Sequence, residues 1–350
     1  MPARLPTCGG VALEKVLVTG ATGFVGSVLC RRLADYGMEL RCLVRPDNDA
    51  SNLIGLEYER IEGSLEDESS LRKALQGVDG VYHLAALVSF RRRDAAAMRS
   101  INVDGTARVA RLAREAGVER LLYMSSIAAV GHSRDRCPID ETADYNFGPW
   151  KIPYCDTKRG GELAVLAEVD RGLDAVIVNP SSMFGPGDRR KAEGSLLQAL
   201  AYDKIPFCPA GGLNVADVRD VAAGTIAAME RGRTGERYIL GGENLTGRQL
   251  FTKIAGVLGK RPPRFTLPGW LMRSFGQALS LVDAVRPLEP PMTGALARMA
   301  PLWMWYSSDK AGRELGYAAW PIEMALKETF DWMFDLDLLD PDRIQAYGRV

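Results

Sequence analysis

Residues 15–26, with the sequence KVLVTGATGFVG, constrain the fold more than any other part of this chain. An apolar run is followed directly by three glycines spaced three apart, and then by a helical pattern. Glycines at such a turn let backbone N–H groups approach a pyrophosphate at the positive end of the helix. The alternative is a tight strand-to-helix turn without a ligand. We predict a dinucleotide cradle made of Gly20, Ala21, Thr22, Gly23, Phe24, Val25 and Gly26.

Short apolar runs alternate with longer helical patterns through the first half of the chain. The runs are nearly continuous rather than alternating apolar and polar, which is typical of a sheet buried on both faces. Strand–helix alternation of this kind predicts an α/β fold with a doubly wound parallel (Rossmann) sheet. The predicted strands are 15–20, 39–44, 58–63, 81–86, 120–126 and 174–180, and the predicted helices include 24–36, 67–76 and 95–116.

The pattern changes after Pro180, where proline and glycine become frequent. Residues 237–242 nevertheless predict one more strand of the same sheet, so the two halves interleave. We expect a dinucleotide-binding domain of 15–180, joined again by about 217–242. A smaller substrate lobe is expected from 181–216 and 243–340, and residues 1–14 form an N-terminal extension.

Amphipathic helices are predicted in this lobe at 246–258, 268–285 and 321–337. The helix at 268–285 carries an apolar stripe that we expect to pack on the small lobe or across a dimer contact, with a lipid-facing role as the alternative. The stripe consists of Leu271, Phe275, Leu279 and Val282.

Composition excludes several classes of protein. The chain has 44 basic and 44 acidic residues, and this balance argues against nucleic-acid binding. Six scattered cysteines and two histidines lack the spacing of a metal site, so no metal is expected. No run approaches the ~20 apolar residues of a membrane-spanning helix. The first residues lack the apolar core of a signal peptide, so a cytoplasmic protein is expected.

The second predicted strand ends in CLVRPDND, which places Arg45 where dinucleotide sites distinguish NAD from NADP. An acidic residue there receives ribose hydroxyls, whereas a guanidinium pairs with a 2′-phosphate. We therefore expect NADP(H) to be preferred, with NAD(H) as an alternative because Asp47 or Asp49 could reach a ribose. An arginine on a solvated turn is the remaining alternative.

The chain contains two Tyr-x-x-x-Lys segments, PYCDTK at 153–158 and WYSSDK at 305–310. Tyr154 and Lys158 lie in a helical pattern and are neighbours on one face. A lysine ammonium stabilises a phenolate and lowers the pKa of the tyrosine from its ordinary ~10. Tyr306 follows neither a sheet strand nor a glycine turn, and the residues after it predict a capped surface helix ending at Gly316. We expect Tyr154 to be the acid–base group and Tyr306 to be scaffold.

The segment YMSS at 123–126 ends a predicted strand, so Ser125 or Ser126 lies at the carboxyl edge of the sheet. Ligands of doubly wound sheets bind at that edge. A hydroxyl there can donate a hydrogen bond to a developing oxyanion. The pattern favours hydride chemistry at a carbonyl or secondary alcohol.

These segments together resemble the extended short-chain dehydrogenase/reductase family. The resemblance covers nearly the whole chain beyond residue 14, through TGATGFVG at 19–26, HLAA at 83–86, NVDGT at 102–106, YMSS at 123–126 and PYCDTK at 153–158. Other segments are similar to the dihydroflavonol-reductase-like branch, and most similar to the group named hopanoid-associated sugar epimerase. These are LVR at 43–45, VNPSSMFGPGD at 178–188, GLNVADVRDVA at 212–222 and ERYILGGENLT at 236–246.

The resemblance implies site residues. The active hydroxyl of the family lies five residues before a glycine, here Gly131, which selects Ser126 over Ser125. Asn102 matches the asparagine that supports the lysine through water. Asn179 stands where many sugar-nucleotide epimerases carry arginine, which argues against a nucleotide-sugar substrate. The implied catalytic set is Ser126, Tyr154, Lys158 and Asn102, and the implied cofactor lining beyond the cradle is Arg45, Ser64, Leu65, Leu84, Ala85, Ala86, Tyr154, Lys158 and Pro180.

The expected function is NADP(H)-dependent oxidoreduction of a small-molecule carbonyl or alcohol, or of a sugar- or lipid-linked substrate. Tyr154 exchanges the proton, Lys158 tunes Tyr154, and Ser126 holds the substrate oxygen. Two alternatives remain: a sugar epimerase or dehydratase that regenerates its cofactor in each cycle, and a non-catalytic NADP-sensing protein. The resemblance also implies a homodimer.

Overall fold

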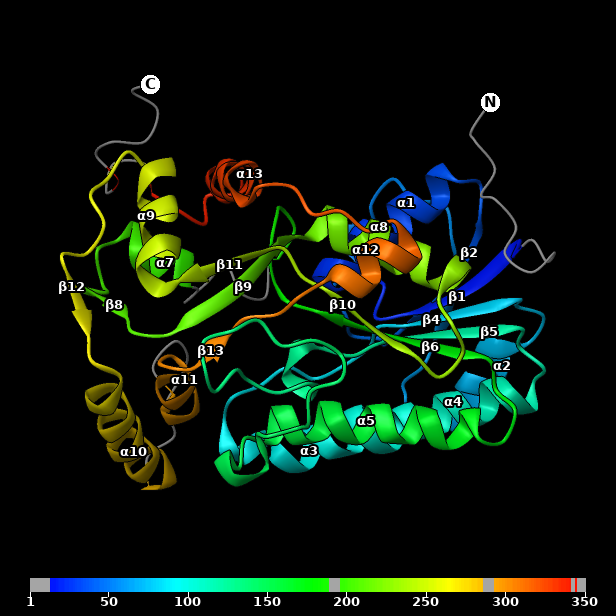
Figure 1. The fold of residues 1–350 in the computed structure, drawn as a ribbon. Helices are drawn as coiled ribbons and strands as arrows, with labels where there is room; N and C mark the ends of the chain where they lie inside the picture. The colour runs from blue at the N-terminus through cyan, green and yellow to red at the C-terminus, as the bar shows by residue number, and fades with distance from the viewer. Residues whose placement is uncertain (1–12, 189–195, 286–292, 341–343, 345–350) are drawn as a thin grey trace.

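The computed structural model describes residues 13–188, 196–285, 293–340 and 344. A sheet of seven parallel strands forms its centre, in the order β10-β6-β5-β4-β1-β2-β3 (Figure 1). The predicted doubly wound parallel sheet is confirmed. The strands are β1 Lys15–Thr19, β2 Glu39–Val44, β3 Glu59–Glu62, β4 Gly80–His83, β5 Arg120–Met124, β6 Ala175–Pro180 and β10 Arg237–Leu240.

Helices cover both faces of this sheet, which explains why its central strands are largely apolar, whereas the edge strand β3 has the sequence ERIE and is mostly exposed. On one face lie α1 (Phe24–Asp35) and α8 (Val218–Arg231), packed through Leu29, Leu33 and Ile226. On the other face lie α2 (Glu68–Leu75), α4 (Thr106–Glu115) and α5 (Pro153–Val169) (Figure 1). Pro153 occupies the first turn of α5, where its missing N–H costs no helical hydrogen bond.

The strand order reverses between β1 and β4. After β1 the chain moves outward through β2 to β3, and it then returns to place β4 on the other side of β1. Ligands of open α/β sheets bind at such a switch point, beyond the carboxyl ends of the strands. His83 fixes this region, because its ring bonds the Thr19 hydroxyl of β1 at 2.7 Å and the Thr106 hydroxyl of α4 at 3.0 Å.

A smaller lobe has its own sheet, formed by β7 (Ser182–Phe184), β9 (Gly212–Asp217), β11 (Glu243–Thr246) and β13 (Trp303–Met304). Two further short strands, β8 and β12, pair with each other. The remaining elements are β8 Phe207–Pro209, β12 Phe265–Leu267, α7 Leu196–Ala201, α9 Gly247–Val257, α10 Gly269–Val285, α11 Gly294–Met299, α12 Asp309–Leu315 and α13 Ile322–Asp335. The core of this lobe is formed by apolar side chains of α7, α9 and α13.

Two predicted elements differ from the structure near the switch point. The helix expected over 95–116 is divided into α3 (Ala95–Arg99), a π-helical segment (Ser100–Gly105) and α4. The strand expected over 81–86 ends at His83, and the Leu84 N–H donates to the Thr19 carbonyl at 3.0 Å. π-Helical turns occur often at functional sites, and this one carries Asn102.

The apolar stripe on α10 does not pack on the small lobe. Leu271, Phe275 and Val282 are exposed, whereas Met272 and Gly276 form the buried side. The prediction that this stripe packs on the small lobe is therefore wrong for these three residues, because α11 packs against the opposite face of α10. Among the residues that the structure describes, no helix is both long and apolar enough to cross a membrane.

Candidate active site

The three glycines of the cradle are fixed by close backbone packing after β1. Gly20 has φ +78°, and a Cβ there would lie 2.7 Å from the Ala85 nitrogen. A Cβ at Gly26 would lie 2.1 Å from the Gly20 carbonyl oxygen. The Gly23 N–H donates to that same carbonyl at 3.0 Å as α1 begins. Side chains are excluded here, so the first N–H groups of α1 are approachable by an anion.

Two buried hydroxyls at the same edge of the sheet also fit a polar ligand. Ser125 follows β5 and Ser181 follows the neighbouring strand β6. Their oxygens are enclosed, and neither has a hydrogen-bond partner among the described residues. A buried hydroxyl is costly unless it is paired, so a ligand with amide or hydroxyl groups fits this edge. Together with the open cradle, this donor set fits a pyridine nucleotide.

The remaining predicted cofactor residues lie where neighbouring strands end. Ser64 and buried Leu65 follow β3, Leu84 to Ala86 follow β4 and pass beside Gly20, and Pro180 closes β6. The Ser64 hydroxyl accepts from the Glu66 N–H at 3.3 Å, as the cap of a turn. The carboxyl edge therefore gathers residues from five strands around the switch point.

Arg45 is exposed just after β2 and is linked to the cradle. Its guanidinium lies 3.5 Å from the side-chain oxygen of Asn48, and the Asn48 amide donates to the Thr22 hydroxyl. The Asp49 carboxylate accepts from the Ser51 N–H and hydroxyl, each at 2.8 Å. Since Asp49 is engaged in its own turn, Arg45 is better placed than Asp49 to meet a ligand group.

Ser126 and Tyr154 interact at the carboxyl end of β5. Burial raises the pKa of Tyr154 to about 12, and the nearby Ser126 side chain opposes this rise in pKa. The Ser126 oxygen accepts from the Ala128 N–H at 3.1 Å, which leaves the hydroxyl proton free to donate. Phe90 packs edge-on against the Tyr154 ring, with 5.4 Å between centroids. The phenol therefore stays protonated at neutral pH and can act as an acid.

Lys158 lies one turn after Tyr154 and is almost fully buried. Its ammonium donates to the Met124 carbonyl at 2.8 Å and lies 4.8 Å from the centre of the Tyr123 ring. Burial lowers the pKa of Lys158 to about 7, although the charge of Glu162 acts in the opposite direction. The hydrogen bond of the ammonium goes to Met124 and not to Tyr154, so the tuning of Tyr154 by Lys158 stays a prediction.

Asn102 is buried in the π-helical segment and anchors the loop after β4. Its side chain forms two hydrogen bonds with the Leu87 backbone, accepting at 2.8 Å and donating at 2.9 Å. The amide also reaches the Thr157 hydroxyl at 3.2 Å, next to Lys158. Asn102 thus ties the cofactor-lining loop to helix α5.

Sequence reasoning missed a buried carboxylate behind the catalytic candidates. Glu162 is fully buried on α5, four residues after Lys158, and its side chain accepts from the Asn179 amide at 2.6 Å. The same amide donates to the Ser126 carbonyl at 2.9 Å. Arg159 balances the charge at 2.9 Å. The Lys-x-x-x-Glu spacing was the available signal, since residues four apart share a helix face.

The second Tyr-x-x-x-Lys pair is built differently. Tyr306 lies just after β13, so the expectation that no strand precedes it is wrong, and it is buried with its hydroxyl donating to the Gly131 carbonyl. Lys310 lies inside α12 and bonds Glu236 at 2.6 Å and the Arg237 carbonyl at 2.8 Å. The predicted helix is present, with Gly316 as its left-handed C-cap. Tyr306 and Lys310 therefore serve separate structural contacts.

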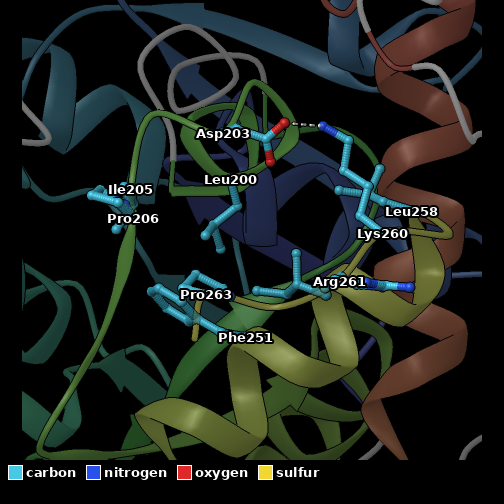
Figure 2. A pocket seen from close by; sticks show the side chains of 11 residues that line it. Leu200, Asp203, Ile205, Pro206, Phe251, Leu258, Lys260, Arg261 and Pro263 are labelled. Atoms are coloured by element: carbon cyan, nitrogen blue, oxygen red, sulfur yellow. Dashed lines mark hydrogen bonds and ion pairs between the residues drawn. The ribbon is translucent and has the colours of Figure 1, made fainter. Parts of the chain in front are cut away.

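A pocket of about 230 Å³ lies in the small lobe between α7 and α9 (Figure 2). Its walls include Leu200, Phe251 and Leu258, and an ion pair between Asp203 and Lys260 at 2.8 Å lies at its edge. None of the predicted site residues lines it. It is separate from the edge of the sheet described above.

The fold and this edge define a nucleotide-binding enzyme of the short-chain dehydrogenase type. The chain belongs to the NAD-dependent epimerase/dehydratase family, whose model matches residues 16–241. This is the extended short-chain dehydrogenase/reductase family that the sequence motifs indicated, and its members are NAD-dependent oxidoreductases and epimerases.

Individual relatives resemble nearly the whole chain. A Synechocystis protein named as a dihydroflavonol 4-reductase is 36% identical, over 90% of this chain and 93% of its own length. Sterol demethylase protein B of Methylococcus capsulatus is 34% identical, over 90% of this chain and 97% of its own length. The crystal structure of gox2253 has 37% identity and a TM-score of 0.83, covering 93% of this chain and all of that chain.

Proposed function

We propose that the protein is an NADP(H)-dependent reductase that interconverts a hydrophobic ketone and its secondary alcohol. The observation that carries this proposal is the placement of Tyr154 near Ser126, whose side chain lowers the pKa of the phenol, at the edge of the sheet that also holds the glycine cradle. The names of the reductase and sterol-processing relatives support a hydrophobic substrate.

In this function each side chain has one task. The nucleotide, when bound, supplies or accepts the hydride. Ser126 donates a hydrogen bond to the substrate oxygen, which stabilises negative charge as it develops. Tyr154, protonated below its pKa of about 12, delivers the proton to that oxygen. Lys158, when protonated below its pKa of about 7, contributes positive charge one helical turn from Tyr154, and Asn102 holds the loop after β4.

The alternative within the family is an epimerase or dehydratase, in which the nucleotide is oxidised and reduced within one turnover. The two are distinguished by incubating purified protein with NADPH and a panel of hydrophobic ketones. A reductase consumes NADPH in a one-to-one ratio with the alcohol formed, as followed by absorbance and chromatography. Product formation without net loss of NADPH would instead establish the epimerase or dehydratase.

The NADP(H) preference depends on Arg45, and we predict that Arg45→Glu reverses it. Charge reversal replaces attraction for the 2′-phosphate by repulsion, so NADPH affinity should fall about 10- to 100-fold while NADH affinity changes little. Thermal-shift titrations with both nucleotides measure this difference. Arg231→Glu, an exposed arginine at the end of α8, is the matched control and should retain wild-type affinities. Equal stabilisation of the wild type by NADPH and NADH would contradict the assignment.

A further inference from the structure

Exposed large apolar side chains are concentrated on the surface of two consecutive elements of the small lobe, β12 and α10. We call this surface the β12–α10 face and define it by its exposed side chains. The fractions exposed are 73% for Phe265, 65% for Trp270, 39% for Leu271, 44% for Phe275 and 48% for Val282. Both elements lie at one end of the molecule, next to each other along the chain (Figure 1). Exposed apolar clusters of this kind mark interaction sites.

The opposite side of α10 is already occupied. A Cβ at Gly276 would lie 2.8 Å from the Arg298 nitrogen on α11, and a Cβ at Gly294 would lie 2.7 Å from the Ser280 nitrogen. The two helices therefore pack backbone to backbone through small residues. Because this contact accounts for the buried face, the outward stripe of α10 has no partner within the described chain.

The charge around this face is strongly biased, although the whole chain is neutral. Residues 244–282 contain six basic residues and no acidic residue. Lys253 and Lys260 pair with acids from other segments. The other four basic residues are arginines that form no ion pair with any described residue. Arg248 donates to the Arg264 carbonyl at 2.9 Å and to the Thr266 hydroxyl at 3.0 Å, and the other three are Arg261, Arg264 and Arg273. Arg261 also lines the pocket of Figure 2.

An apolar face with tryptophan and phenylalanine, bordered by arginines that pair with no acidic side chain of the described residues, matches the chemistry of an anionic membrane surface. Aromatic and aliphatic side chains enter the headgroup region, while arginines attract anionic lipids. A second copy of the chain fits less well, because a two-fold contact would bring two basic faces together, and residues 244–282 contain no acidic residue to pair with the arginines. We propose that residues 264–282 dock on the surface of a lipid bilayer that contains anionic phospholipids.

Docking would bring the candidate active site close to the bilayer. Arg298 of α11 donates to the Trp150 carbonyl at 3.2 Å, four residues before Tyr154. Met299 packs in the same apolar cluster as Tyr154 and Ile127. One short helix thus separates the docking face from the site. Docking on a bilayer does not depend on which reaction the active site catalyses.

The test is cosedimentation of the full chain with vesicles. We expect binding to phosphatidylcholine vesicles containing phosphatidylglycerol, and weak binding to pure phosphatidylcholine. Trp270→Ser/Phe275→Ser and Arg264→Glu/Arg273→Glu should each lower the partition coefficient by about tenfold or more. Added salt should weaken binding by the wild type.

The matched control is Trp320→Ser, which removes an equally exposed tryptophan (72%) outside this face and should bind as the wild type does. Circular-dichroism melting confirms that each variant is folded. Equal binding by all variants, or no binding to anionic vesicles, overturns the proposal. Light scattering tests the alternative that this face binds a second copy of the chain. If the wild type is a dimer that does not bind vesicles, and Trp270→Ser/Phe275→Ser makes it a monomer, the face serves self-association and the membrane proposal is wrong.

Discussion

Replacing Tyr154 by phenylalanine is expected to lower kcat for ketone reduction by about 10²- to 10⁴-fold, the usual contribution of a positioned general acid. The variant keeps the ring that packs against Phe90, so its melting temperature and its nucleotide affinity should stay close to wild type. Steady-state NADPH oxidation and a fluorescence titration with NADPH measure the two effects. A rate within threefold of wild type would exclude Tyr154 as the proton donor.

Tyr306→Phe is the matched control, because it removes the same hydroxyl from the other Tyr-x-x-x-Lys segment. That hydroxyl donates to the Gly131 carbonyl in a buried position. Its loss leaves the carbonyl unpaired, at a cost of about 1–3 kcal/mol in the free energy of unfolding. The two variants should therefore differ in their effects: Tyr154→Phe lowers kcat, whereas Tyr306→Phe lowers the free energy of unfolding.

Lys158→Met is expected to reduce the rate and to change how stability depends on pH. In the folded protein without nucleotide the lysine has a pKa of about 7, below the ~10.4 of an unfolded chain. Below pH 7 both states are protonated, so the full cost of burying the charge is present. Between pH 7 and about 10.4 the unfolded chain binds more protons, so the stability of the wild type rises with pH.

The methionine variant lacks this titration, so the amount by which its free energy of unfolding exceeds that of the wild type should decrease as the pH rises. The lowered pKa corresponds to roughly 5 kcal/mol at most in the free energy of unfolding, part of which is offset because the Met124 carbonyl loses its donor. Urea unfolding at pH 6, 8 and 10 measures the difference. A constant difference across these values would contradict a buried, titrating Lys158. Lys310→Met, which removes the partner of Glu236, should leave the rate unchanged.

The sequence predicted the parts of the site that depend on position along a strand. Gly20, Ser126 and Pro180 each follow an apolar run, and parallel strands bring their carboxyl ends to one edge. Glu162 and Asn179 were not predicted as a pair, because their contact joins a helix to a strand across the core. The second sheet was also missed, since β7 and β13 have only three and two residues and its longest strand, β9, mixes apolar and polar residues in the sequence GLNVAD. The π-helical segment at Asn102 has an ordinary helical pattern in sequence.

The chain passes more than once between its two sheets, and this connectivity ties the unfolding of one lobe to that of the other. Strand β10 returns to the first sheet after β9 of the second, and α12 follows β13 to clamp β10, with Glu314 accepting from the Tyr238 hydroxyl at 2.7 Å. Neither half can be detached by a single cut without removing part of the other. The two lobes should melt as one cooperative unit, and changes that alter substrate choice must be tolerated by the nucleotide half as well.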